Sequence, residues 1–500
     1  MNMRLSRSLL ALLATLFLSL ACFKVDDPLN QPCTVDRDCI SSALVCIANV
    51  CREGSDAQVR LVHAASGVDA VDLYLAGSEE PIVANLGFKN VSPWIRVPSD
   101  ELSLEFRAAG AAASEQALFT TENTTISSEN STTLIFAGLK DDSQDDSLRV
   151  LPIVESWGGS LADRARVRLV HAGADSPDFL VDGLEGAAFS LARYEDSAAA
   201  GTPISTSGDE RIQLFEGDEL STAFSLPPLS EGSEVLLVAT GLRSSLAREQ
   251  EGFSLLAIGE EGLLQRVLQD PQIFTLHGAR DAGSLENCTN GFEVATNFEY
   301  GEIQSTFLSP GEYTFELYEY PSGCNTTVLN PRGNIAPALD AGERYLILIT
   351  GELTPDDEEP SIQVASFVDR FAPNSPEETL IRFVHGASFT QIFVGNETEP
   401  GFITEENVYT DPIAWRQESR ENTLEPGPYA LGIADANGTP TPTPPLSVIV
   451  NFDIDASAGS RQWGIVAGDP LVDAQDLDKP IQLMLVDTST DEWTVQLVDP

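Results

Sequence analysis

The chain has 500 residues, of which 42% are hydrophobic, and it carries 77 acidic against 28 basic side chains, a formal net charge of -49. The apolar content is enough for packed cores and excludes a wholly disordered chain. The charge excludes nucleic acid and anionic lipid headgroups as partners, because both would be repelled. It leaves open a calcium-dependent role or simple solubility in a salty medium.

The N-terminus is predicted to be a secretory signal with a lipidation site. Residues 1–7 carry two positive charges, and the apolar run 8–20 is shorter than the roughly 20 residues that a membrane-spanning helix needs. Residues 18–22 resemble a bacterial lipobox, which implies cleavage after residue 21 and a lipid on Cys22 that anchors the protein to a membrane. Because Phe23 is not Asp, the resemblance implies the outer membrane. The alternative is an ordinary signal peptide followed by a free cysteine.

A linker, 22–32, is predicted to lead into a small cysteine-rich module at 33–52. The module has too few apolar residues for a core, so we expect two disulfides to hold it, with their pairing open. Zinc is the alternative, although structural zinc sites usually draw on close Cys-x2-Cys pairs, which are absent. With Cys22 lipidated, an even six cysteines remain for disulfides in an oxidising compartment. They are Cys33, Cys39, Cys46 and Cys51 in the module, and Cys288 with Cys324, which we expect to form a third bridge.

All four histidines lie in one repeated motif. A branched residue stands four places before each histidine, an apolar residue just before it and a small residue just after it. The histidines are His63, His171, His277 and His385, spaced 108, 106 and 108 residues apart. This regularity predicts four repeats, at 57–156, 165–262, 271–370 and 379–500.

Further landmarks recur inside the repeats. An apolar run closes at Gly138, Gly241, Gly351 and Gly468, and a last apolar segment follows it. Residues 100–103 return as 218–221, and residues 310–313 return as 426–429. Apolar residues alternate or form short runs bounded by turn residues, as in 71–75 and 313–317. The predicted fold class is therefore all-β: tandem, immunoglobulin-like sandwiches of antiparallel sheets, strung like beads behind the disulfide-rich module.

The opening of the first repeat carries a family resemblance. Residues 59–66 (VRLVHAAS), 71–75 (VDLYL) and 167–177 (VRLVHAGADSP) resemble the start of the bacterial surface domain known as domain of unknown function 4397. The resemblance covers the first repeat and the opening of the second. It implies an extracytoplasmic β-sandwich, often in tandem, with no established activity.

One histidine in each repeat invites a catalytic or metal-binding interpretation. A single histidine cannot supply a typical zinc site, so carboxylates such as Asp69, Asp72 or Asp175 would have to complete it. We favour a structural role, in which a ring nitrogen bonds a backbone carbonyl or an Asp and fixes the next turn. Sequence signatures of hydrolases, metalloproteases and nucleotide-binding enzymes are absent. We therefore predict no catalytic residues, no metal and no cofactor.

Two functional hypotheses from different classes are favoured over an enzymatic function. The first is a structural or adhesive surface protein that meets a protein or glycan, with Trp94, Trp157 and Trp415 as natural contacts and Trp463 buried in a core-like run. The second is a carbohydrate- or calcium-binding accessory module with one weak site in each repeat. Acidic runs at 141–146 and 355–360 are interpreted as solvated loops, with weak calcium binding as the alternative.

Overall fold

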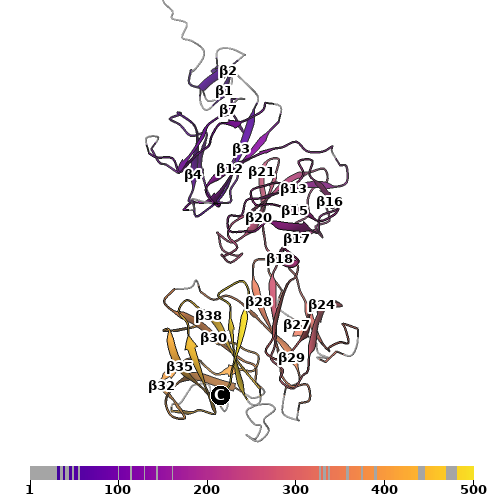
Figure 1. The fold of residues 1–500 in the computed structure, drawn as a ribbon, viewed down its shortest axis with the longest axis vertical. Helices are drawn as coiled ribbons and strands as arrows, with labels where there is room; N and C mark the ends of the chain where they lie inside the picture. The colour runs from indigo at the N-terminus through magenta and orange to yellow at the C-terminus, as the bar shows by residue number, and fades with distance from the viewer. Residues whose placement is uncertain are drawn as a thin grey trace, which may run out of the picture. The chain divides into compact units, whose positions relative to one another are not determined.

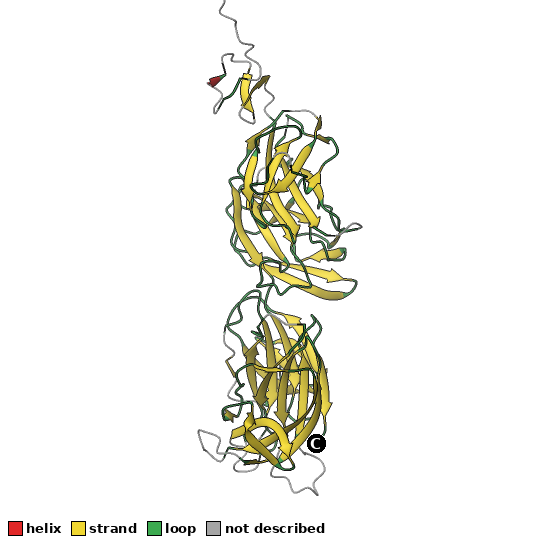
Figure 2. Cartoon of the chain, turned by 90° about the vertical axis from the view of Figure 1, so that its left-hand side faces the viewer, coloured by secondary structure: helices red, strands yellow, loops and turns green. Residues whose placement is uncertain are grey.

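Figures 1 and 2 show the structure, a computed structural model. It describes residues 31–33, 38–39, 44–47, 50–53, 57–98, 101–112, 115–128, 130–141, 145–159, 161–325, 328–329, 334–335, 338–355, 360–372, 376–387, 391–436, 445–468 and 481–500. The predicted signal 1–21 and the lipidation site Cys22 lie outside these residues. The described residues form strands, turns and loops, with one 3₁₀ position at Asp38 and no α-helix among them, which confirms the all-β prediction. None of them belongs to a helix long and apolar enough to cross a membrane.

The chain divides into two compact units, each described by itself. The first comprises Met1–Gly158 and Glu261–Leu263, and the second Gly159–Glu260 and Leu264–Pro500. The described residues form four pairs of packed sheets, which we call sandwiches one to four in chain order. Ahead of them, β1 (Leu44–Ile47) and β2 (Val50–Glu53) form the antiparallel hairpin of the cysteine module.

Sandwiches one and two each enclose an apolar core between two sheets. Sandwich one packs the sheet β12-β11-β3-β6 on the sheet β5-β4-β8-β9, and sandwich two packs β16-β13-β19-β20-β21 on β15-β14-β17-β18. The strands of sandwich one are β3 (Gln58–Ser66), β4 (Val71–Leu75), β5 (Val83–Leu86), β6 (Ile95–Arg96), β8 (Leu104–Ala108), β9 (Phe119–Thr120), β11 (Thr132–Leu139) and β12 (Arg149–Val154), with β7 (Glu101–Leu102) and β10 (Thr124–Thr125) as a separate pair. Those of sandwich two are β13 (Ala165–His171), β14 (Phe179–Asp182), β15 (Phe189–Leu191), β16 (Thr202–Ile204), β17 (Arg211–Glu216), β18 (Glu219–Ser225), β19 (Glu234–Thr240), β20 (Ser254–Gly259) and β21 (Gly262–Leu268).

Sandwiches three and four repeat this plan. Sandwich three packs β25-β22-β28-β29 on β24-β23-β26-β27, and sandwich four packs β34-β30-β38-β39-β40 on β36-β32-β31-β35-β37. The strands of sandwich three are β22 (Gln272–His277), β23 (Leu285–Thr289), β24 (Phe292–Phe298), β25 (Ile303–Phe307), β26 (Thr314–Glu319), β27 (Asn334–Ile335), β28 (Arg344–Thr350) and β29 (Gln363–Val368). Those of sandwich four are β30 (Thr379–His385), β31 (Gln391–Glu399), β32 (Phe402–Val408), β33 (Ile413–Ala414), β34 (Asn422–Leu424), β35 (Gly427–Asp435), β36 (Leu446–Ser447), β37 (Val450–Ala456), β38 (Arg461–Ala467), β39 (Gln482–Asp487) and β40 (Thr494–Val498).

The histidine strand lies inside the first sheet of every sandwich. On one side it pairs with a short antiparallel strand, and on the other with the apolar strand that ends near a glycine. That second neighbour, which is β11, β19, β28 or β38, runs parallel to the histidine strand. The first sheets are therefore mixed, which corrects the purely antiparallel sheets predicted from the sequence. A parallel neighbour needs a long crossover, and the strands of the second sheet supply it.

One of the predicted landmark equivalences is wrong. Residues 100–103 precede β8, which pairs with β4, whereas residues 219–221 are the first residues of β18, which pairs with β17. The counterpart of β8 in sandwich two is β17, the strand that pairs with β14. The equivalence of 310–313 with 426–429 agrees with the structure, because β26 and β35 pair with corresponding strands. In both, a tyrosine hydroxyl donates to the carbonyl four residues earlier, at 2.7 Å from Tyr313 and 2.9 Å from Tyr429.

Sandwiches three and four are not separate beads. Side chains on the outer faces of their first sheets, such as Phe274, Leu346, Trp463 and Met484, belong to one buried cluster. The bead-like arrangement expected from the sequence is wrong for these two sandwiches. Apolar runs such as 345–349 place hydrophobic residues on both faces of a strand, and both faces must then be covered.

Candidate functional site

The four histidines that mark the repeats in the sequence are all fully buried. Three of them make the same contact with the turn that follows: the ring Nε2 lies close to the backbone carbonyl oxygen six residues later. The distances are 2.9 Å from His63 to Asp69, 2.9 Å from His171 to Pro177 and 3.0 Å from His277 to Gly283. This is the contact that the structural interpretation of the histidines requires.

The other ring nitrogen of these three histidines is also engaged. The backbone N–H two residues later donates to Nδ1, from Ala65, Gly173 and Ala279 at 3.3–3.4 Å. The partners assign the proton to Nε2, which donates to the carbonyl, because a neutral imidazole has one donor and one acceptor. Burial lowers the pKa of His63 and His277 and favours this neutral form. Neither nitrogen is left to bind a metal or accept a substrate proton.

The fourth histidine, His385, is buried at the end of β30 in the same register. Each histidine pairs with the residue two places before the glycine that closes the neighbouring strand. The pairs are His63 with Phe136, His171 with Ala239, His277 with Ile349 and His385 with Val466, ahead of Gly138, Gly241, Gly351 and Gly468. The histidine and the closing glycine of each repeat, which recur together in the sequence, therefore also lie close together in the structure.

The position next to the histidine strand has no room for a side chain, which explains the glycine there. Gly241 shows this clearly. Its φ is +98°, which favours glycine, and a Cβ there would lie 2.5 Å from the carbonyl oxygen of Gly252. The next residue, Leu242, donates its N–H to the carbonyl of Glu251 at 2.6 Å. Gly138 and Gly351 have the same surroundings. The glycine thus lets the end of β19 approach the segment just before β20 closely.

Sequence reasoning missed the residue opposite each histidine. Lys89, Tyr194, Gly301 and Arg416 all have positive φ, between 61° and 83°. Each donates its backbone N–H at 2.8 Å to the carbonyl of the histidine it faces. Their residue types share nothing, so only the backbone conformation reveals them.

Two of the carboxylates proposed to complete a metal site, those of Asp72 and Asp175, are engaged elsewhere. Asp175 accepts the N–H groups of Arg243 and Ser244 and the Ser244 hydroxyl at 2.7–2.9 Å, and Asp281 caps the same turn of sandwich three. Asp72 accepts the N–H groups of Asn85 and Gly110 at 2.6 and 2.9 Å. Asp69 contributes its backbone carbonyl to His63. These groups stabilise turns.

The cysteines form three disulfides among the described residues, as predicted. Their pairs are Cys33–Cys46, Cys39–Cys51 and Cys288–Cys324. The sulfurs of Cys33, Cys39 and Cys51 lie within 4.8 Å of one another. Because both bonds of the module lie together and a metal needs thiolates, this grouping is a disulfide knot and not the alternative zinc site.

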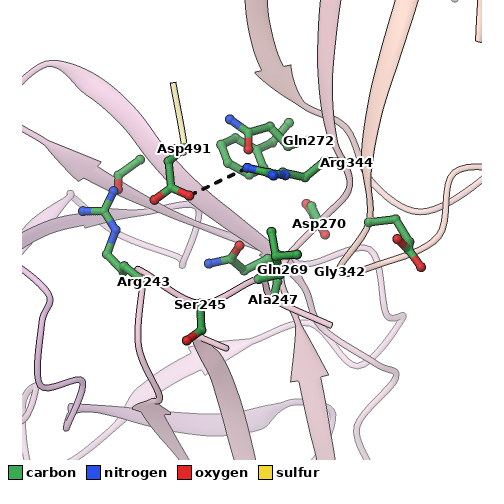
Figure 3. A pocket seen from close by; sticks show the side chains of 13 residues that line it. Arg243, Ser245, Ala247, Gln269, Asp270, Gln272, Gly342, Arg344 and Asp491 are labelled. Carbon is green, nitrogen blue, oxygen red and sulfur yellow. Dashed lines mark ion pairs between the residues drawn. The ribbon is translucent and has the colours of Figure 1, made fainter. Parts of the chain in front are cut away.

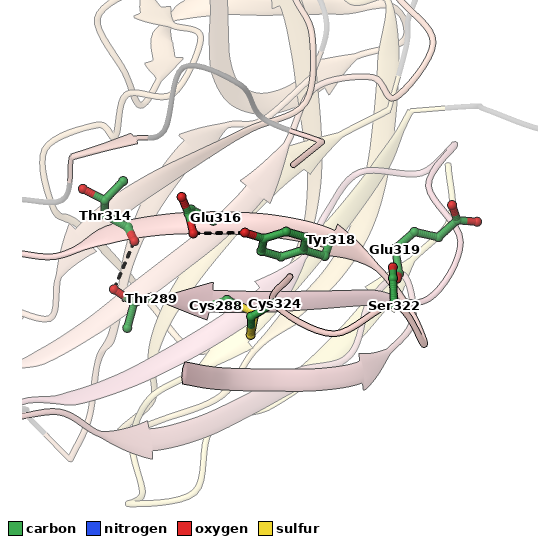
Figure 4. Close-up of a disulfide and its surroundings, with 8 residues drawn as sticks. All are labelled: Cys288, Thr289, Thr314, Glu316, Tyr318, Glu319, Ser322 and Cys324. Atoms are coloured by element: carbon green, nitrogen blue, oxygen red, sulfur yellow. Dashed lines mark hydrogen bonds between the residues drawn. A yellow bond between two sulfur atoms is a disulfide. The ribbon is translucent and has the colours of Figure 1, made fainter. Parts of the chain in front are cut away.

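The third disulfide closes the outer face of the second sheet in sandwich three (Figure 4). Cys288 lies on β23 and is fully buried, and Cys324 lies on the segment after β26. Nearby, the Thr289 hydroxyl donates to the Thr314 carbonyl at 3.0 Å, and the Tyr318 hydroxyl donates to Glu316 at 3.1 Å. Burial raises the pKa of Tyr318, so this phenol stays a donor at neutral pH.

A polar recess in the second unit is shown in Figure 3. Arg344 and Asp491 form an ion pair at 4.0 Å in its lining, and Arg243, which also lines it, pairs at 3.1 Å with Glu216 outside the lining. Ser221 and Ser245 also line it, but no histidine is among its lining residues. Its charges are thus matched within the chain, and its serines have no imidazole base beside them.

The tryptophans expected to meet a ligand are mostly covered. Trp463 is fully buried, as predicted, while Trp94, Trp157 and Trp415 are half-buried. The guanidinium group of Arg60 lies 4.4 Å from the ring centre of Trp94. The most exposed large hydrophobic residue of the described chain is instead Phe292, 74% exposed beside the Asn290–Gly291 turn.

Comparison with known proteins identifies one part of the chain. Residues 57–182 match the family described as Domain of unknown function (DUF4397). The match covers sandwich one and continues through β13 and β14 of sandwich two, so it contains both His63 and His171. No curated protein matches the chain.

Two solved structures show only distant likeness. One is the TIE protein of Bacillus anthracis, 9% identical, with 93% of this chain and 78% of that chain covered and a TM-score of 0.15. The other is a candidate cell adhesion protein from Bacteroides uniformis, 13% identical, with 41% of this chain and 97% of that chain covered and a TM-score of 0.15.

Proposed function

Because residues 57–182 match the DUF4397 family, we propose that the chain is an exported cell-envelope protein whose tandem β-sandwiches have a structural or adhesive role at the surface. A lipid on Cys22 anchors it to the outer membrane. The observation that carries the proposal is the set of three disulfides, since such bonds form and persist in oxidising, extracytoplasmic compartments.

The buried histidines support a non-catalytic role. A general base needs a free lone pair within reach of a substrate, and His63, His171 and His277 use both ring nitrogens in their own turns. We propose no enzymatic activity. The charge of -49 favours a protein or glycan partner over nucleic acid.

The anchor is tested by labelling the native cells with radioactive palmitate. We expect label in the wild type and in Ser19→Leu, which places Leu three residues before the cysteine as in the strictest lipobox pattern, and none in Cys22→Ser. Label that persists in Cys22→Ser contradicts the anchor. Protease treatment of intact cells then separates a surface location, in which the sandwiches are cleaved, from a periplasmic one.

The adhesive role is tested separately, with purified protein lacking residues 1–22. Binding to a glycan array and to surface proteins of neighbouring cells is measured with and without calcium. We expect Phe292→Ser to weaken adhesive binding, because it removes the most exposed aromatic ring of the described chain. A calcium-dependent glycan signal that is insensitive to this change would favour the accessory-module alternative.

A further inference from the structure

Both faces of the first sheet in sandwich three are apolar. On β28, Tyr345 and Ile347 point into the core of sandwich three, while Leu346 and Leu348 point to the opposite face. Successive side chains of a strand alternate between faces, so this strand is built to be covered on both sides. Neighbouring β22 behaves alike, with Ile273 facing inward and Phe274 outward.

The first sheet of sandwich four has the matching property. On β39, Leu483 and Leu485 face the core of sandwich four, whereas Met484 and Val486 face outward. The outward side chains of the two sandwiches form one buried cluster. Besides the outward-facing residues of β22, β28 and β39, it includes Trp463 and Trp493 of sandwich four. Four sheets are thus stacked with three apolar layers between them.

The turn between β39 and β40, residues 488–493, reaches onto sandwich three. Its Trp493 ring stacks on the Phe274 ring at 3.8 Å between centroids, and lies 5.1 Å from the Trp463 ring. Arg344 at the start of β28 donates to the carbonyls of Thr488 and Thr490 at 3.0 and 3.1 Å. We call residues 488–493 the latch turn.

A buried ion pair orients Arg344 toward the latch turn. Its Nε and Nη2 atoms lie 2.9 and 2.5 Å from the Asp369 carboxylate, which is fully buried in the segment that joins the sandwiches. Separating the sandwiches would remove two carbonyl partners from this guanidinium and expose the shared apolar layer to water.

We propose that sandwiches three and four are a single cooperative body, held closed by the latch turn, that unfolds as one. Neighbouring domains usually move independently, unless a large hydrophobic interface joins them. Here the interface between the two sandwiches is itself a third apolar core. The inference does not depend on the proposed adhesive function. It predicts that damage inside one sandwich is felt equally in the other.

Native-state hydrogen exchange of the full chain tests this. Ile347→Val removes one methylene group from the core of sandwich three and leaves the shared layer intact. We expect the slowest amides of β28 and of β38 to lose protection by the same factor, between about two-fold and about twelve-fold. Ile433→Val, in the core of sandwich four, should act on both strands in the same way.

Both substitutions are mild, so the variants should still fold. The control is Ile212→Val in the core of sandwich two, which should leave both strands unchanged. Ile347→Val with reduced protection in β28 and normal protection in β38 would overturn the proposal. When Ile347→Val is combined with Trp493→Ala, the β38 amides should lose less protection than the β28 amides. An equal loss of protection in the two strands would refute the role of the latch turn.

Discussion

The indole ring of Trp493 lies parallel to the phenyl ring of Phe274, with ring centroids 3.8 Å apart and an interplanar angle of 4°. Both side chains are buried. The contact joins the last turn of sandwich four to the first strand of sandwich three, so a change at one residue has consequences in both sandwiches.

Trp493→Ala is expected to lower the free energy of unfolding of sandwiches three and four by about 3–5 kcal/mol, the usual cost of emptying a buried tryptophan site. Urea unfolding followed by circular dichroism measures it. Trp157→Ala serves as the matched control, because Trp157 is only half-buried, and should cost about 1 kcal/mol or less. Equal effects of the two substitutions would contradict the interlocked arrangement.

Gly241→Ala should destabilise sandwich two more than Gly217→Ala. Both glycines have positive φ, which costs an alanine about 1–2 kcal/mol. Only at Gly241 would the new Cβ also collide with a backbone carbonyl, whereas nothing lies within 4 Å of it at Gly217. We expect a further loss of about 1–3 kcal/mol at Gly241, measured by urea unfolding. Similar losses at the two sites would count against the close approach of the segments.

Stability is expected to fall on mild acidification because of His63 and His277. Burial lowers the pKa of both in the folded chain, so below the unfolded value of about 6.5 the unfolded chain binds more protons. The contribution of each neutral, buried histidine to the free energy of unfolding is therefore complete above about pH 6.5. It is lost as the pH falls through the pKa of the histidine in the folded chain. The slope reaches about 1.4 kcal/mol per pH unit for each histidine.

Urea midpoints of the wild type and of His277→Gln, measured from pH 7.5 to 5.5, check this pH dependence. Carboxylates titrate in both proteins and cancel in the difference. A His277→Gln variant that folds and keeps the full acid slope of the wild type would exclude His277 as its source.

Replacing Cys288 and Cys324 by alanine together should destabilise sandwich three by about 3–4 kcal/mol, because the bond closes a loop with a sequence separation of 36. Exchange of the β26 amides reports the loss. The double change Cys39→Ala with Cys51→Ala breaks a bond in the module of the first unit and should leave β26 unaffected. No loss in the first variant would show that the bond does not constrain sandwich three.

Alternating apolar residues, the histidine spacing and the cysteine count were enough to predict the all-β class, the repeats and the three disulfides. Periodicity works here because one strand motif, which ends in a buried histidine, recurs wherever the chain must hold the same turn. Cysteines in a segment without an apolar core are equally informative, since little else can hold such a segment. Neither signal could give the pairing of Cys33 with Cys46, because spacing alone does not fix which sulfurs meet.

Other features depended on non-local pairing. Residues 100–103 and 218–221 are similar in sequence, yet they belong to strand regions with different pairing partners. The reason is that strand pairing depends on the tertiary fold and not on the local sequence. The positive φ values of Lys89, Tyr194 and Arg416 had no sequence signal, since these residue types seldom adopt that conformation.

The amino-acid sequence by itself determined that each repeat has a strand that ends in a histidine and a later apolar strand that ends at a glycine, because residue type and spacing are local properties of the pattern. Only the tertiary structure decided that these two strands run parallel, that both ring nitrogens of three histidines bond their own turns, and that sandwiches three and four share a core. Apolar runs such as 345–349 indicate that both faces of a strand must be packed against other side chains. What covers the second face is fixed only when Phe274 and Trp493, far apart in the chain, are brought into contact.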